Sequence, residues 1–299
     1  MAGELERFNS TLVYEAQAPA EQLQADLQQI REFDKRAEEK TRRYKYITFG
    51  SLLFGIGSFL LVIALNKVGL LALVGVAVFG LITGIVLWVR GAKFNLANRR
   101  YELFGELARL LGRDMAKDAA LTVALDMTPP NDARKKVNDG QAGDWKVKYF
   151  VDPWLKLGGR FADGTSFQIT LIEKFQARGK WKRSRSGKNK YKTKTKSSTQ
   201  AAVRLFPKLK RYENLPQVTD KAASLLRLPE WVTVKNMDAT ADELSLTACT
   251  SEAWSVRRHD PKTTHDGVEM VATMLLSLYQ VLHSANALSE KSWFETIVV

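Results

Sequence analysis

The sequence predicts an α+β protein in which a hairpin of two transmembrane helices precedes a soluble domain with an antiparallel sheet. Two uncharged runs of 20 and 22 residues, 46–65 and 68–89, predict the hairpin. Alternating apolar and polar residues predict the strands, and an amphipathic pattern over 264–288 predicts a C-terminal helix packed on the sheet. The expected parts are a polar N-terminal region (1–45), the hairpin (46–89), an amphipathic juxtamembrane helix (90–118) and the soluble domain (119–299).

The N-terminal region is rich in charges, and we expect its first 17 residues to be poorly structured. Between residues 19 and 43 an apolar stripe recurs at spacings of four, three and seven, in Leu23, Leu27, Ile30 and Ala37. Such a narrow stripe fits a coiled-coil seam or a helix docked on a neighbour. It fits a solvated helix that extends from the membrane equally well.

Each uncharged run has the length of a membrane span. A helix rises about 1.5 Å per residue, so each run reaches roughly 30 Å, the thickness of the hydrocarbon core of a bilayer. Only Asn66 and Lys67 separate the runs, and so short a connection forces the two helices to be antiparallel neighbours. Lys and Arg are frequent beyond the outer ends, whereas the turn carries only Lys67. The positive-inside rule therefore predicts an integral protein of the cytoplasmic membrane with both termini cytoplasmic.

Small residues recur four apart in both predicted helices, a spacing that lets helix backbones approach closely. They are Ser51 and Gly55 in the first helix and Gly80 and Gly84 in the second. These residues can pack the two helices of one hairpin together or join several copies into a homo-oligomer. Neither run contains an ionisable residue, which disfavours a transporter but leaves an oligomeric pore open.

The soluble domain follows an amphipathic helix expected over residues 94–117. Asp152-Pro153 is expected to separate two strands, and Ala162-Asp163-Gly164 to form a hairpin turn. We expect a polar loop at 131–144 and a short helix at 217–228. Strands are predicted at 119–127, 146–151, 155–161, 165–176, 231–235 and 243–248.

Residues 179–198 form the most distinctive segment of the chain. The net charge is +13, but 15 Lys and Arg residues and no acid fall between positions 174 and 211, so the rest of the chain is close to neutral. Lysines alternate with Tyr and Thr after a Ser-Gly turn sequence, a pattern that predicts a long basic β-hairpin.

The register of this hairpin depends on the length of its turn. A turn of two or four residues centred on Gly187 and Lys188 gathers five cations and one indole on one face of the ribbon. The pairs would then be Arg185 with Lys190, Arg183 with Lys192, and Trp181 with Lys194. A three-residue turn would change all of these pairs.

Like charges directly opposite each other destabilise a ribbon, so we expect this hairpin to be loose alone and ordered by a polyanion. Anionic lipid headgroups are the favoured partner, because a tethered basic segment is attracted to an anionic bilayer. An acidic protein and, less favoured, nucleic acid are the other candidates. The expected polyanion-binding residues are Lys180, Trp181, Lys182, Arg183, Arg185, Lys188, Lys190, Tyr191, Lys192, Lys194 and Lys196.

Catalytic chemistry has little support in the sequence. His259 and His265 each precede an aspartate, but the chain has only one further histidine, which is too few for a phosphohydrolase-type metal site. Cys249 is the only cysteine and lies in a strand pattern, so it is expected to be a small core residue. Gly187-Lys188 lacks the glycine that a P-loop places five residues earlier. We expect no catalytic residue, no metal site and no cofactor.

Three functions remain as hypotheses from the sequence. The favoured one is a non-enzymatic membrane-anchored scaffold or binding protein whose cytoplasmic domain presents the cationic hairpin to anionic lipid or an acidic partner. The alternative is an oligomeric two-helix membrane effector or channel that the soluble domain gates. The third is a membrane tether for nucleic acid.

Overall fold

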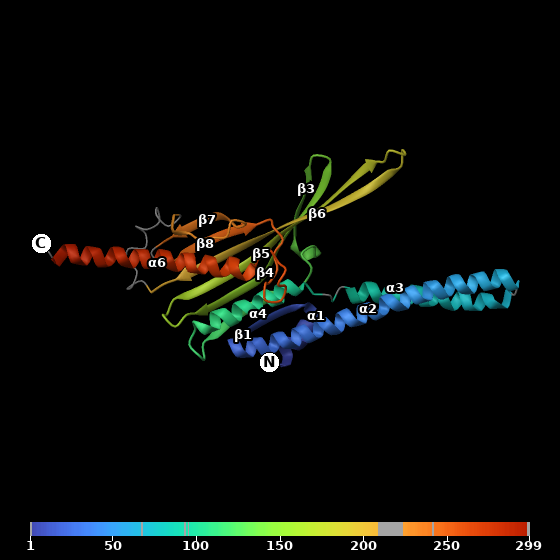
Figure 1. Ribbon diagram of the computed structural model, residues 1–299, viewed down its shortest axis with the longest axis horizontal. Coiled ribbons are helices and arrows are strands. Elements are labelled where there is room, and N and C mark those ends of the chain that lie inside the picture. Colours follow the sequence, from blue (N-terminus) through green and yellow to red (C-terminus); the bar gives the residue numbers. More distant parts are fainter. Residues whose placement is uncertain are drawn as a thin grey trace. The chain divides into compact units, whose positions relative to one another are not determined.

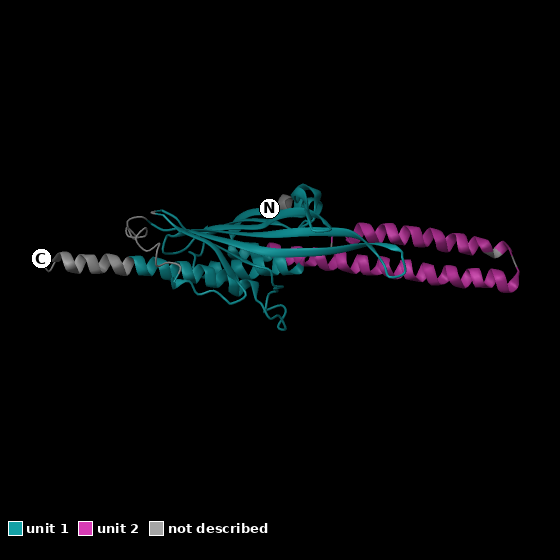
Figure 2. Cartoon of the chain, turned by 90° about the horizontal axis from the view of Figure 1, so that it is seen from above, with its two compact units in different colours: residues 1–25, 98–299 teal, residues 26–97 magenta. Residues whose placement is uncertain are grey.

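The computed structural model describes residues 2–66, 68–92, 94, 96–208, 224–240 and 242–297. It contains an eight-stranded antiparallel sheet, helices on that sheet and two long apolar helices near the N-terminus (Figure 1). The predicted α+β class is therefore confirmed. The chain divides into two compact units, Met1–Ala25 with Asn98–Val299 and Asp26–Ala97, which Figure 2 colours separately.

The sheet has the strand order β1-β2-β4-β5-β6-β8-β7, and β3 pairs with β4 beside this path. Three central strands are 16 to 18 residues long, about three times the usual strand length. This length allows them to extend beyond the core. The strands are β1 (Val13–Pro19), β2 (Ala120–Asp126), β3 (Lys136–Ala142), β4 (Trp145–Arg160), β5 (Ser166–Arg183), β6 (Asn189–Phe206), β7 (Thr233–Ala239) and β8 (Leu244–Thr250).

The core lies on one face of the sheet, under helices α4 (Asn98–Arg113) and α6 (Gly267–Ile297). Alternate side chains of the central strands are fully buried there, as the two-residue period of a strand requires. Helix α6 packs on β6, β8 and α4, and its Met274 and Leu278 are completely buried. The strand residues of this core include Phe167, Ile169, Leu171, Ala201, Val203 and Leu205.

The N-terminal segment is ordered, so the expectation for residues 1–17 is wrong. Helix α1 (Ala2–Thr11) leads into β1, which pairs with β2 along its whole length. Phe8 and Tyr14 are almost completely buried, and their apolar surface holds the segment on the domain. Only a few widely spaced residues of this segment face the core, and the residues between them are polar. The segment therefore has no apolar pattern from which its order could be predicted.

Two further expectations for the sheet are wrong. The predicted loop at 131–144 contains a 3-10 turn (Ala133–Lys135) and strand β3. Asp152-Pro153 does not end a strand, because β4 continues past it through a register shift between Asp152 and Leu155. A bulge tolerates proline, which has no N–H to contribute to the ladder. Most of the predicted helix at 217–228 lies outside the described residues.

The second unit contains α3 (Leu71–Ala92) and most of α2 (Ala20–Leu65). Both helices are long and apolar enough to cross a membrane. The residues 68–70 expected to start the second helix form a separate 3-10 turn. Large apolar side chains remain exposed along both helices, for example Phe54 and Phe79. Exposed apolar surface of this extent is typical of contact with lipid or protein.

Candidate polyanion-binding arm

The basic segment forms one end of the β5–β6 ribbon, and we call residues 174–198 the arm (Figure 1). Pairing of β4 with β5 ends at Lys146 and Gly179, and pairing of β8 with β6 ends at Thr250 and Thr199. Beyond position 179 the arm is therefore a two-stranded ribbon.

A three-residue loop closes the arm. The backbone N–H of Ser184 donates to the Lys188 carbonyl at 2.8 Å, and the N–H of Gly187 donates to the Ser184 carbonyl at 2.9 Å. Gly187 has φ +76°, a left-handed conformation in which three-residue hairpin loops favour glycine. The loop is therefore Arg185-Ser186-Gly187, and the turn of two or four residues predicted from the sequence is wrong.

The observed register differs from the predicted one by three residues, since Trp181 pairs with Tyr191 and not with Lys194. Because three is an odd number, side chains that were expected to share a face lie on opposite faces of the ribbon. None of the three predicted pairs forms. The observed pairs near the tip are Arg183 with Asn189, Lys182 with Lys190, Trp181 with Tyr191, and Lys180 with Lys192.

This register separates the arm into two chemically distinct faces, because directly paired residues share a face. The cationic face consists of Arg178, Lys180, Lys182, Lys190, Lys192, Lys194 and Lys196. The aromatic face consists of Ala177, Gly179, Trp181, Arg183, Tyr191, Thr193 and Thr195.

Positive charge on the cationic face is largely uncompensated. Among the described residues, Lys180 alone of this face has a carboxylate partner, the exposed Asp144 at 3.5 Å. Trp145 on β4 offers weaker compensation, since the Nζ atoms of Lys180 and Lys194 lie 4.9 Å and 5.9 Å from its ring centroid. Lys180 directly opposes Lys192, and such pairs destabilise an unliganded ribbon.

An open hollow of about 390 Å³ lies at the tip of the arm. Five of its seven lining residues are cations and none is a carboxylate, so it suits an oxyanion that accepts several charge-assisted hydrogen bonds. Its lining is Lys182, Arg183, Ser184, Arg185, Lys190, Tyr191 and Lys192.

The predicted polyanion-binding residues are not all brought together. Lys188 ends the turn, and Lys194 and Lys196 lie toward the base of the arm. Lys196 is six residues from Lys190, about 20 Å along a strand. The predicted residues therefore extend along the arm from its base to the hollow at its tip.

Four residues were missed at the sequence level: Arg178 within the arm, and Trp145, Lys146 and Lys148 beside it. The alternation of residues 145–151 indicates a strand with its lysines on one face. The sequence does not specify which strand pairs with residues 145–151 or in which register. Without this information, their side chains could not be placed beside the arm.

A buried ion network lies where the arm joins the core. Arg100 on α4 donates from Nη2 to Asp152 and to Glu173, both at 2.7 Å, and all three side chains are almost fully buried. Each carboxylate has a second cation as partner. Lys135 Nζ lies 2.7 Å from Oδ1 of Asp152, and Arg99 Nη2 lies 3.0 Å from Oε1 of Glu173. The network attaches α4 to β4 and β5 at the base of the arm.

A second ionic cluster ties α4 to the segment after β8. Glu106 bonds Arg109 and Arg258, and His259 lies 3.6 Å away. Burial raises the pKa of Glu106, but hydrogen bonds and charge from Arg109 and Arg258 outweigh it, so its pKa lies below the ordinary value.

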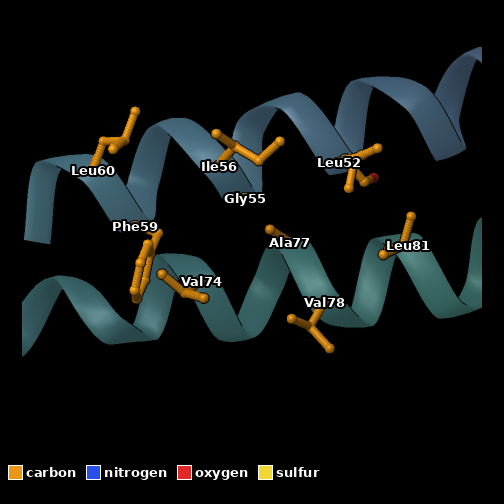
Figure 3. Close-up of a pocket in the computed structure, with 10 residues that line it drawn as sticks. Leu52, Gly55, Ile56, Phe59, Leu60, Val74, Ala77, Val78 and Leu81 are labelled. Carbon is orange, nitrogen blue, oxygen red and sulfur yellow. The ribbon is translucent and has the colours of Figure 1, made fainter.

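The small residues of the apolar helices face each other within one hairpin. Gly80 contacts Ser51, Gly84 contacts Thr48, and Gly55 contacts Ala77. A Cβ atom at Gly84 would lie 2.6 Å from the Thr48 hydroxyl oxygen and 3.2 Å from its Cα. Beside these contacts runs an apolar groove of about 270 Å³ (Figure 3), lined by residues that include Leu52, Ile56, Phe59, Val74, Val78 and Leu81.

The fold and the arm define an α+β protein that combines a basic two-faced β-ribbon with two helices long and apolar enough to cross a membrane. No family model, characterised protein or solved structure matches the chain. Within the described ranges, no group of three or more His, Cys, Asp or Glu residues is placed to hold a metal ion. The functional argument therefore depends on the arm.

Proposed function

We propose that this protein is a non-enzymatic, membrane-anchored binding protein whose arm binds anionic lipid headgroups. The observation that carries the proposal is the hollow at the tip, which five cations line without a carboxylate. A headgroup phosphate supplies the missing negative charge and accepts hydrogen bonds from Lys and Arg.

In this proposal the apolar part of α2 and α3 up to Val89 cross the cytoplasmic membrane as a hairpin. Their length, composition and exposed apolar side chains support the crossing. Arg42, Arg43, Arg90 and Arg99 belong to the basic residues that follow the outer ends, whereas the turn has a single lysine. The positive-inside rule then places both termini in the cytoplasm, where anionic lipid is enriched.

The shape of the cationic face suits a membrane surface. Its side chains repeat about every 6.6 Å along each strand and about 4.8 Å between strands, so they form two closely spaced rows along the ribbon. Each Lys or Arg close to an anionic bilayer contributes about 1 kcal/mol, and the attraction weakens within a Debye length. The seven cations of this face therefore suffice to hold the arm on the membrane at physiological salt.

An acidic protein is the alternative partner for the same cations. An oligomeric channel has less support, because Ser51, Gly55, Gly80 and Gly84 already make contacts within one hairpin. Copies would have to associate through other surfaces of α2 and α3.

The test is energy transfer between the arm and labelled lipid in nanodiscs that hold the full-length protein. The full chain is required because β1 belongs to the sheet. A donor fluorophore is attached at Ser186→Cys in a Cys249→Ser background, and an acceptor is attached to a fraction of the headgroups. We expect transfer to rise with the anionic lipid fraction and to fall with added salt.

Charge variants show whether the arm causes this response. Lys182→Gln, Lys190→Gln and Lys192→Gln together remove three of the seven cations of the cationic face, so they should weaken lipid binding by about 3 kcal/mol and reduce the transfer accordingly. The matched control removes three exposed lysines elsewhere in the same unit, Lys156, Lys235 and Lys262, and should retain it. Equal transfer in neutral and anionic nanodiscs, or a response that is unchanged in the arm variant, would show the proposal to be wrong.

A further inference from the structure

The aromatic face of the arm borders a trough of about 470 Å³, a volume within the range of ligand-binding sites. Its floor consists of small residues on the two central strands, and lysines of β4 line its side. One carboxylate lines the trough on this face, Asp139 of β3, which lies opposite Lys148 and forms an ion pair with Lys136. The other trough residues on this face are Lys146, Lys148, Ala177, Gly179, Tyr191, Thr193 and Thr195.

Cations flank the aromatic pair on both sides along the ribbon. Lys146 is level with Gly179, and Lys148 is level with Ala177, toward the base of the arm. Arg183 lies on the same face toward the tip. The distance from the level of Lys146 to that of Arg183 is four residues, about 13 Å. Among the described residues no carboxylate forms an ion pair with Lys146, Lys148 or Arg183.

The aromatic pair is exposed and held in place. The rings of Trp181 and Tyr191 lie 5.1 Å apart at an interplanar angle of 58°, with the residues 71% and 53% exposed. Tyr191 leans across β5 over Gly179, and a Cβ atom at position 179 would overlap its ring and hydroxyl. Glycine at this position therefore permits the placement of the tyrosine ring.

We infer that the aromatic face binds single-stranded nucleic acid, with bases against Trp181 and Tyr191 and phosphates at the flanking cations. Exposed aromatic rings beside cations form the usual platform for single strands, because every base has a π-face for stacking. A duplex hides these faces between its base pairs. One nucleotide is too short to contact cations on both sides of the pair, so a strand of several nucleotides fits better.

This site overlaps the proposed lipid contact only at the tip, where Arg183 and Tyr191 also line the hollow. The cationic face itself lies on the opposite side of the ribbon, so lipid binding there leaves the rest of the aromatic face accessible. A second copy of the chain is a poor occupant, because like charges of the two faces would meet. Neutral nanodiscs remove any competition from anionic lipid, and variants of the two rings separate binding at the aromatic face from binding at the cationic face.

The experiment measures fluorescence anisotropy of a labelled oligouridylate with full-length protein in neutral nanodiscs, and displacement of that probe by inorganic polyphosphate, which lacks bases. Trp181→Leu with Tyr191→Leu preserves every charge and should weaken oligouridylate binding by about tenfold or more. The same variant should leave polyphosphate binding unchanged. Phe206→Leu, at an exposed aromatic residue at the other end of β6, is the matched control and should change neither.

A second measurement uses the wild-type chain and does not depend on how the variants fold. Ultraviolet cross-linking of bound oligouridylate should place the cross-links on Trp181 or Tyr191. Cross-links confined to other segments, or oligouridylate affinity that is insensitive to loss of both rings, would overturn the inference. Mononucleotide binding as strong as that of the oligonucleotide would also overturn it, because it would show that one nucleotide fills the site.

Discussion

Replacing Arg100 with methionine removes the guanidinium at the centre of the buried ion network. Arg100 is 2% exposed and bonds Asp152 and Glu173, which are almost fully buried themselves. It also lies over the Trp154 ring at 5.2 Å and donates to the backbone carbonyl of Asp126. Methionine retains much of the side-chain volume, so the change acts mainly on charge and hydrogen bonds.

The expected loss of stability follows from the partners that remain. Breaking a buried ion pair by removing one partner costs about 3–5 kcal/mol, because the other charge is left uncompensated. Here Lys135 still contacts Asp152, and Arg99 still contacts Glu173. We therefore expect about 3 kcal/mol, which lowers the melting temperature of a domain of this size by about 6–12 °C.

The assay is thermal unfolding of the full-length protein in detergent, followed by tryptophan fluorescence. Arg36→Met is the matched control, because Arg36 pairs with Glu32 on an exposed helix surface, with side chains 75% and 57% exposed. Such a pair contributes about 0–1 kcal/mol. Equal melting temperatures for Arg100→Met and Arg36→Met would refute the view that the network attaches α4 to the base of the arm.

Three further predictions concern the carboxylate on α4, the hairpin and the turn of the arm. Glu106 has a lowered pKa, so its contribution to stability is present above the ordinary carboxyl pKa and is lost as the pH falls through its pKa in the folded protein. Glu106→Gln should therefore lower the melting temperature at neutral pH but not in acid, and a difference that grows in acid would contradict this. Gly84→Val should lower the unfolding temperature in detergent, because the valine side chain would collide with Thr48. Gly57→Val should not, because a side chain at position 57 meets open space, and equal effects of the two changes would argue against the observed packing. Gly187→Val should speed amide exchange in the arm because φ is positive there, and unchanged exchange would count against the three-residue loop.

Long, strongly periodic elements of this fold are predictable from the sequence alone. The apolar helices and α6 have patterns many residues long, and burial of one face explains α6 directly. Strand β1 could not be predicted in this way, because its stability comes from pairing with β2, which is about a hundred residues away. Strand β3 could not be predicted either, because its side chains are mostly exposed and form no apolar pattern.

The arm shows how one local detail limits prediction of a site. Alternating lysines identify a ribbon, but the left-handed Gly187 determines loop length, and loop length determines which residues share a face. A two-residue turn and a three-residue turn are both compatible with Ser186-Gly187-Lys188. The sequence therefore predicts which residues carry the charge. It does not predict that the two aromatic rings lie on one face of the ribbon and most of the cations on the other.

The most direct test of the central claim is hydrogen–deuterium exchange of the full-length protein in nanodiscs of neutral and anionic lipid. Like-charged pairs such as Lys182 and Lys190 loosen the free arm, and headgroup phosphates should relieve that repulsion. We predict that exchange slows across residues 180–196 only in anionic nanodiscs, and that salt reverses the change. Identical exchange of these residues in both lipids, with an intact sheet, would contradict the account.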